Sequence, residues 1–342
     1  MLLLPFTAAV RSDAGNEALK ENSPMKNSPT PRARAFLASA AILTATSAVA
    51  QPQFNPMIRS DATEKVGEHS YVILDENVAF VPNVGIVVGD RATLIVDTGL
   101  GEANGETILR EAEKLSNNEI FYITATHFHP EHDLGAAAFP DSARVVRWEG
   151  QQFEADTQGQ ETIDLFAGIA PVLEELLDGV TYREPDVLFE DSVTIDLGGV
   201  KVIATGVGPN HTLGDTVFWV EEDRVLFTGD VVMPVFPAVS GQSGDLNKWL
   251  ANLEDFNRLD PDVVVPAHGR LGNVELIRNY RAYLEAVRER VLAGRRAGES
   301  LEDLTAELAP GLAEDFAILR PANGDPTGRI SAAIQAAWRI DD

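Results

Sequence analysis

THFHPEHDLG, at residues 126–135, carries four side chains of metal-binding type within six positions: His127, His129, Glu131 and His132. The apolar run before it, residues 120–126, is typical of a β-strand. In an extended segment alternate residues share a face, so the first two histidines are expected to project together. Pro130 then breaks the strand and lets the glutamate and the third histidine approach from a turn. One short segment can therefore serve two neighbouring metal ions.

Three further candidates follow other predicted strands. They are His211 in GVGPNHTLGD (206–215), Asp230 at the end of VLFTGD (225–230) and His268 in VVVPAHG (263–269). A single histidine is usually an ordinary core or surface residue, but of the 6 histidines only His69 lies away from a strand end. Loops at strand ends gather at a sheet edge, where sites form. Since the chain has no cysteine, the pattern predicts a metal site held by histidine and carboxylate.

The rest of the chain alternates short apolar runs with helical stretches, which indicates an α/β protein. We expect strands at 70–77, 84–90, 92–99, 193–205, 216–230 and 262–269, the first three forming an antiparallel meander and 216–230 a hairpin that turns near Glu222-Asp223. We expect helices at 103–116 and 273–298. Their apolar faces are Ile108, Ala112 and Leu115 in the first, and Ile277, Tyr280, Tyr283, Leu284, Val287 and Val291 in the second.

These motifs, in this order, resemble the metallo-β-lactamase superfamily of metallohydrolases, whose signature is HxHxDH followed by a distant His, an Asp after a TGD-like strand end and a final His. The resemblance covers about residues 70–270 and implies an αββα sandwich, two face-to-face sheets with helices outside, here with C-terminal helices added. It also implies the roles of the residues. His127, His129 and His211 would bind the first metal; Glu131, His132 and His268 would bind the second; Asp230 would bridge both; and Asp97 of IVDTG would orient a ligand histidine.

One position departs from the family pattern. Glu131 stands where the family has aspartate, and its side chain is one methylene longer. The longer carboxylate can still coordinate, or it can shift or weaken the second ion. Asp133, just after His132, is the alternative ligand, although it is expected to point away from that histidine.

The ligand set indicates Zn²⁺, two per chain, with Fe²⁺ or Mn²⁺ as alternatives. A metal-bound water has its pKa lowered to about 7, so the predicted reaction is attack of a metal-bound hydroxide on an ester, lactone or amide carbonyl, with Glu131 and Asp230 as catalytic carboxylates. The Asp230 arrangement resembles glyoxalase II and lactonases more than the Cys-ligated β-lactamases, and β-lactam turnover is expected only as a secondary activity. The alternatives are a mononuclear iron oxygenase of the same superfamily and a non-catalytic metal-binding protein.

The charge of the chain restricts its partners. With 27 Lys+Arg against 53 Asp+Glu the formal net charge is −26, which repels nucleic-acid backbones and anionic membrane surfaces. We therefore expect a small-molecule substrate, no nucleic acid and no membrane partner. The sequence makes no prediction of the oligomeric state.

Two segments are candidates for substrate contacts. The apolar, Pro- and Gly-punctuated segment 231–243 could wall a pocket with Met233, Val235 and Phe236. The insertion 148–190 could form a lid through five apolar side chains, Trp148, Phe153, Leu165, Phe166 and Leu173. For both segments the alternative is ordinary packing.

The N-terminal region is typical of a bacterial secretion signal. Residues 1–50 contain a basic flank (Lys26, Arg32 and Arg34), an apolar run over 35–50 and the small-residue cleavage site Ala48-Val49-Ala50. Met25 is expected to be the true start and Gln51 the mature N-terminus, which predicts a periplasmic or secreted protein. The alternative is a membrane anchor, but the apolar run is short for one. The catalytic domain is expected at 51–270, and 271–342 as a helical extension packed on it.

Overall fold

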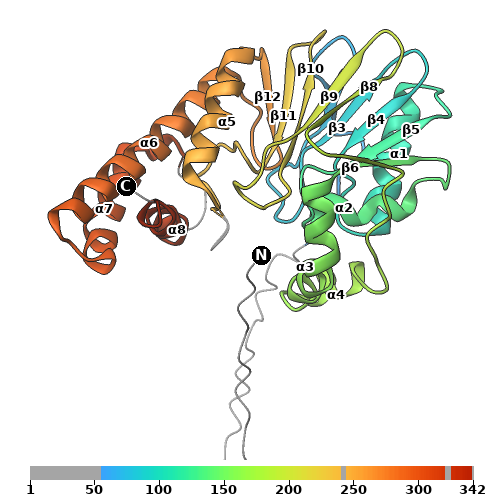
Figure 1. The fold of residues 1–342 in the computed structure, drawn as a ribbon. Coiled ribbons are helices and arrows are strands. Elements are labelled where there is room, and N and C mark those ends of the chain that lie inside the picture. The colour runs from blue at the N-terminus through green and yellow to red at the C-terminus, as the bar shows by residue number, and fades with distance from the viewer. Residues whose placement is uncertain (1–54, 240–243, 320–324, 341–342) are drawn as a thin grey trace, which may run out of the picture. The chain divides into compact units, whose positions relative to one another are not determined.

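The computed structural model describes residues 55–239, 244–319 and 325–340, so the expected signal segment 1–50 lies outside the described residues. None of the helices in these ranges has the length and apolarity that a bilayer-spanning segment needs. The described chain forms two β-sheets with helices on the outer face of each (Figure 1).

The first sheet has seven strands in the order of the sequence, β1 to β7. Its central strands are apolar on both faces, as in VGIVV, because both faces are covered. Strands β1 to β4 form an antiparallel meander, and β4 to β7 are parallel. The strands are β1 (Thr63–Lys65), β2 (Ser70–Ile73), β3 (Val84–Val88), β4 (Thr93–Val96), β5 (Phe121–Thr124), β6 (Arg144–Trp148) and β7 (Val187–Phe189).

The second sheet has five strands in the order β12-β11-β10-β9-β8, all antiparallel except for the pair β11 and β12. The expected strand 193–205 is a hairpin, because Gly198 and Gly199 both take positive φ values, 86° and 80°, that favour a tight turn at glycine. The strands are β8 (Ser192–Asp196), β9 (Lys201–Gly206), β10 (Thr216–Val220), β11 (Val225–Gly229) and β12 (Val263–Pro266).

Three apolar clusters hold the layers together. Between the sheets, Val72, Val87 and Leu94 pack with Phe218 and Phe227. On the far side of the first sheet a second cluster includes Ile108 and Ala112 of α1 (Glu102–Leu115), as the helical spacing predicted. The third lies between the second sheet and the C-terminal helices. The predicted αββα sandwich is confirmed.

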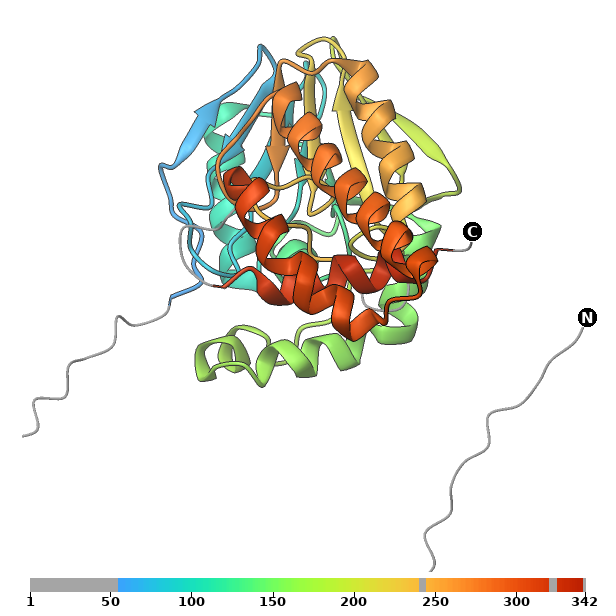
Figure 2. The same ribbon diagram turned by 90° about the vertical axis from the view of Figure 1, so that its left-hand side faces the viewer.

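The first two of the four C-terminal helices lie over the second sheet, the last two pack against the second of them, and together they bury a large apolar surface (Figure 2). They are α5 (Leu246–Leu259), α6 (Val274–Ala297), α7 (Leu301–Asp315) and α8 (Thr327–Trp338), with the short 3₁₀ helix η2 (Ala317–Leu319) before the last. All six apolar residues predicted to line one face of α6 are fully buried. The extension therefore shares the core of the sandwich.

The remaining helices lie on or beside the first sheet's loops. α2 (Pro130–Asp133) and the 3₁₀ helix η1 (Leu134–Ala138) continue the His-rich segment after β5. The segment between β6 and β7, where a lid was predicted, forms α3 (Glu149–Ala167) and α4 (Pro171–Leu176), which project below the sheets in Figure 1.

Candidate metal centre

The predicted ligands come from both sheets and meet at one edge of the sandwich. His127 follows β5 in the first sheet, whereas His211, Asp230 and His268 follow β9, β11 and β12 in the second. The Thr216 N–H donates to the Thr126 carbonyl at 2.7 Å and joins the sheets at this edge.

A glycine makes this close approach of the sheets geometrically feasible. Gly229, with φ 56°, stands directly before Asp230, and a Cβ there would lie 2.6 Å from the Cβ of Thr126. No larger side chain fits this position without moving the strand that carries the His-rich segment.

Three histidines form the first candidate group: His127, His129 and His211. His129 Nδ1 lies 3.0 Å from His127 Nε2 and 3.4 Å from His211 Nε2. One nitrogen from each ring falls within 4.8 Å of the others. The three nitrogens surround a point at which a cation can be held.

The second candidate group consists of Glu131, His132 and His268, whose ligand atoms also lie within 4.8 Å of one another. His132 Nε2 lies 3.8 Å from Glu131 Oε1. The longer carboxylate of Glu131 thus reaches the group in which the family pattern has aspartate.

Asp230 lies between the two groups. Its Oδ2 is 3.5 Å from His211 Nε2, and its Oδ1 is 4.0 Å from His268 Nε2. One carboxylate therefore contacts a histidine of each group, as expected of a residue that bridges two ions.

Three buried polar atoms at this place have no hydrogen-bond partner: Glu131 Oε2, His132 Nε2 and Asp230 Oδ1. An unpaired buried acceptor normally costs about 1–3 kcal/mol. A cation would satisfy all three. The donor set, imidazole nitrogen with carboxylate oxygen, is one that Zn²⁺, Fe²⁺ and Mn²⁺ accept.

The hydrogen bonds of the histidines fix which nitrogen is free. Nδ1 of His211 donates to the Ala238 carbonyl at 2.6 Å, and Nδ1 of His268 donates to the Val81 carbonyl at 3.0 Å. Because a carbonyl only accepts, Nδ1 carries the proton and, in the neutral ring, Nε2 carries the lone pair. Both lone pairs face the candidate groups.

Asp97 fixes the orientation of His132, a histidine of the second group, in the same way. Its Oδ2 accepts from His132 Nδ1 at 2.9 Å, and its Oδ1 accepts from the Thr126 N–H at 2.7 Å. The residue is buried and has φ 70°. Its place is the one that the sequence resemblance implied for a residue that orients a ligand histidine.

Burial and mutual charge set the protonation of the site. Burial, followed by the charges of the neighbouring histidines, lowers the pKa of His127 and His129 well below the usual value, so these rings are neutral. Burial alone would raise the pKa of Asp230, but the surrounding histidines outweigh it and hold the pKa at about 2. Burial would lower the pKa of His132, but the charge of Asp97 outweighs it and raises the pKa to about 9, so a metal at this ring would have to displace a proton.

Asp133 does not join either group. Both of its oxygens accept from Nη2 of Arg147, at 2.8 and 3.0 Å, and both side chains are buried. The alternative ligand of the sequence analysis is thus part of an ion pair behind the site. Sequence reasoning missed Arg147, whose signal was a basic residue within the apolar run RVVRW.

Two further carboxylates that sequence reasoning missed hold the loop of His211. Asp215 accepts from the N–H groups of Asn210, His211 and Thr212. Glu154, on α3, accepts from the N–H groups of Leu213 and Gly214, at 3.0 and 2.6 Å. Neither residue has a motif of its own, because the loop's N–H groups become partners only in the folded chain.

The structure places the predicted pocket wall mainly in the core. Met233 and Phe236 are 1% and 0% exposed and pack under the C-terminal helices, so they are core residues that a substrate cannot touch. Val235 is half-buried at the edge of the same cluster. Ordinary packing, the alternative to a pocket wall, describes these three residues better.

The predicted lid residues lie in four different environments. Leu173 is buried in a small cluster with Leu100 and Leu134. Phe153 and Leu165 are 57% and 67% exposed, and Trp148 packs against β9 at Gly206. Phe166 alone reaches the metal centre: its ring centroid lies 5.7 Å from that of His129.

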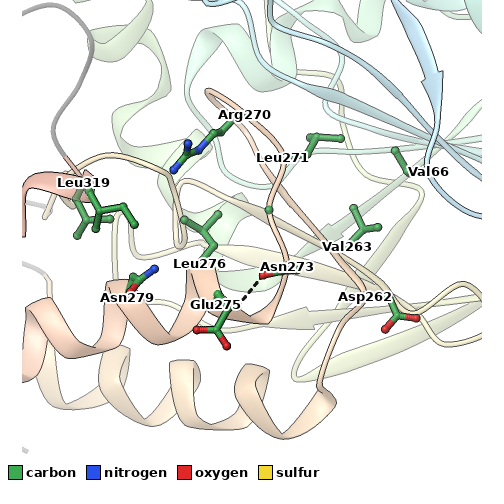
Figure 3. A pocket seen from close by; sticks show the side chains of 12 residues that line it. Val66, Asp262, Val263, Arg270, Leu271, Asn273, Glu275, Leu276, Asn279 and Leu319 are labelled. Carbon is green, nitrogen blue, oxygen red and sulfur yellow. Dashed lines mark hydrogen bonds between the residues drawn. The ribbon is translucent and has the colours of Figure 1, made fainter.

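A separate cavity of about 600 Å³ lies between the turn that leads from β12 into α6 and the end of the helical layer (Figure 3). Arg270, Leu271 and Leu276 line it together with Leu319. None of the candidate metal ligands lines this cavity, and His69, the histidine left out of the pattern, contacts the Val88 carbonyl elsewhere.

The chain is similar to known proteins in sequence and in fold. The model of the metallo-beta-lactamase superfamily matches residues 78–268, which is more than half of the 342 residues. The linear primary-alkylsulfatase of a Pseudomonas species is 28% identical over 218 residues, covering 54% of this chain and 41% of the relative. A type 2 metallo-beta-lactamase from Bacteroides fragilis is 25% identical over 218 residues, covering 61% of this chain and 78% of the relative.

Solved structures share the fold. The inverting sec-alkylsulfatase Pisa1 of Pseudomonas sp. superposes with a TM-score of 0.64 at 17% identity, covering 80% of this chain and 50% of that one. A metallo-beta-lactamase family protein of Thermus thermophilus gives a TM-score of 0.55 at 20% identity, covering 79% and 91%. The chain spans about half of the length of the first curated relatives that it matches.

Proposed function

The chain belongs to the metallo-beta-lactamase superfamily, and on that premise we propose that it is a dinuclear zinc hydrolase acting on an ester, lactone or amide carbonyl of a small molecule. One observation carries this proposal. Two groups of three ligand side chains lie on either side of Asp230, and a carboxylate oxygen of Asp230 faces each group.

When bound, a divalent ion supplies Lewis acidity and lowers the pKa of a water to about 7. The chain's own residues provide the setting for this chemistry. The carbonyls of Ala238 and Val81 and the carboxylate of Asp97 hold three histidine rings with Nε2 toward the centre. Their rigidity means that the ligands need little reorganisation when the substrate arrives.

Glu131 and Asp230 supply the negative charge of the site. Burial raises the pKa of Glu131, so this carboxyl is the group of the pair that more readily takes up a proton. Asp230 remains ionised near neutral pH, because its pKa is held at about 2. Asp230 would contact both ions, and Glu131 would help to hold the second ion through its carboxylate.

A second candidate substrate class is a sulfate ester. The observation in its favour is the similarity to a linear primary-alkylsulfatase over 218 residues. Because the region matched covers 41% of that relative, its activity is not transferred to this chain without a test.

The test is a hydrolysis screen of the purified chain with aryl esters, lactones, thioesters, amides, β-lactams and alkyl sulfates. We expect turnover of carbonyl substrates that a chelator abolishes and Zn²⁺ restores. Asp230→Asn should lower kcat/KM by at least 100-fold, whereas Asp141→Asn, a change of an exposed carboxylate, should leave it unchanged. Turnover of alkyl sulfates alone would replace the carbonyl proposal with the second candidate, and iron-dependent oxygen consumption without hydrolysis would refute both.

We further propose that the protein is exported to the periplasm, on the strength of the signal-like pattern in residues 26–50. The measurement is the N-terminal mass of the protein expressed in a Gram-negative bacterium. A chain that begins at Gln51 and is released by osmotic shock supports export; an uncleaved chain in the cytoplasm contradicts it.

A further inference from the structure

An aromatic pair stands beside the first group of histidines. Phe166, at the end of α3, and Phe80, in the loop before β3, meet edge to face with ring centroids 5.6 Å apart. Phe166 in turn lies 5.7 Å from the ring of His129. We propose that Phe80 and Phe166 form one wall of an apolar subsite that holds an unbranched hydrocarbon chain of the substrate; this inference rests on the proposed hydrolase function.

The position of the pair ties it to the metal centre on two sides. Phe166 touches a candidate ligand of the first group directly. Phe80 is followed by Val81, whose carbonyl accepts from His268 of the second group at 3.0 Å. A substrate group that leaves the centre along α3 must therefore pass these two rings.

The wall is firm because a buried cluster supports it. Leu100, Leu134, Ile163, Leu173 and Leu177 form this cluster, and both phenylalanines pack against it while remaining half-buried themselves. Half-buried aromatic rings on a fixed base offer apolar area that a ligand can cover without any rearrangement.

The backbone conformation of Phe80 also supports the proposal. Its φ of 61° is unusual for a bulky residue and is energetically unfavourable. Such strain persists where the surrounding structure enforces it, and it is concentrated at ligand sites. Here it presents the ring to Phe166.

Two exposed apolar residues lie close to Phe166 in the chain. Leu165 and Ile169 are 67% and 53% exposed, and Ile169 donates its N–H to the Phe166 carbonyl at 3.0 Å. Two acidic residues, Asp164 and Glu174, line the groove at this end of α3. Acidic neighbours disfavour an anionic substituent, so an uncharged hydrocarbon chain fits this surface best.

Length dependence of binding tests the proposal directly. Each methylene that the wall covers should tighten binding about 4-fold, which corresponds to ~0.8 kcal/mol per CH₂. We would measure the Kd of unbranched acyl hydroxamic acids of two to ten carbons by calorimetry with the zinc-loaded protein. The expected result is a Kd that falls steadily with chain length over at least four carbons.

Variants identify the wall. Phe166→Ala and Phe80→Ala should each reduce the dependence of the Kd on chain length by at least half, whereas Phe166→Leu should keep most of it. Phe153→Ala, a change of an exposed ring on the same helix, should not alter it. Zinc content and circular dichroism check that each variant is folded. A flat dependence in the unchanged protein, or one that both alanine variants retain, overturns the proposal.

Parallel hydrolysis assays separate this inference from the proposed function. Esters with a lengthening acyl chain and esters with a lengthening alcohol chain show which side of the bond the wall holds. Chain-length-dependent binding without any hydrolysis would uphold the subsite and refute the hydrolase; hydrolysis without length dependence would do the reverse.

Discussion

Replacement of Arg147 by methionine should destabilise the protein strongly, although the residue touches no candidate ligand. The side chains of Arg147 and Asp133 are 2% and 4% exposed, and two hydrogen bonds of 2.8 and 3.0 Å join them. The variant would leave the Asp133 carboxylate buried and unpaired. Removing one partner of a buried ion pair typically costs 3–5 kcal/mol, and we expect about 4 kcal/mol here.

The substitution should also disturb the metal centre, because Asp133 directly follows Glu131 and His132 in the same short helix. Burial already raises the pKa of Asp133, and the loss of the guanidinium would raise it further, so the variant should take up a proton at a higher pH than the unchanged chain. Zn²⁺ binding at the second group should weaken together with stability.

The assay is equilibrium urea unfolding of the zinc-free protein, followed by fluorescence and circular dichroism. Arg144→Met is the matched control, since this arginine lies on the same strand but is exposed; it should change the free energy of unfolding by less than 0.5 kcal/mol. The double variant Arg147→Met with Asp133→Asn should recover at least half of the loss. A cost below 1 kcal/mol for Arg147→Met, or no recovery in the double variant, would refute the reasoning.

Three other predictions concern carboxylates. Asp97→Ala should weaken the second Zn²⁺ about 10- to 100-fold in competition titrations, because it releases the ring of His132; an unchanged affinity would contradict its orienting role. Glu154→Ala should weaken the first Zn²⁺ about 10-fold and cost about 1–3 kcal/mol of stability, since two N–H groups lose their acceptor, whereas exposed Glu149→Ala should do neither. Burial would raise the pKa of Glu111, but hydrogen bonds, first of all the one from Lys114, lower it below the ordinary 4.5. The free energy of unfolding should therefore fall as the pH drops through that region, and Glu111→Gln should show less of this fall in urea unfolding at pH 7 and pH 4.

The sequence predicted the parts of the molecule that repeat a local pattern. Alternating and continuous apolar runs predicted strands β2 to β5 and β8 to β12, but not β1, β6 and β7. The spacing of Ile277, Tyr280 and Val287 predicted the buried face of α6. The positions of the histidines at strand ends predicted that they would be brought together. Each of these features depends on neighbours within a few residues along the chain.

What the sequence did not predict depends on tertiary neighbours. Asp133 was weighed as a ligand because its partner Arg147 is 14 positions away on another strand. Met233 and Phe236 were expected in a pocket because apolar residues near a site look alike whether they face a substrate or a helix layer. Glu154 was missed because the loop that it holds lies 59 positions away.

The proposed function depends on two neighbouring metal sites that share Asp230. The most direct measurement is the number of Zn²⁺ ions bound by the chelator-stripped protein, counted by calorimetric titration and elemental analysis, for the unchanged chain and for His211→Ala and His268→Ala. We predict two ions for the unchanged chain and one for each variant. A single ion in the unchanged chain, or no bound ion, would contradict two metal sites that share Asp230.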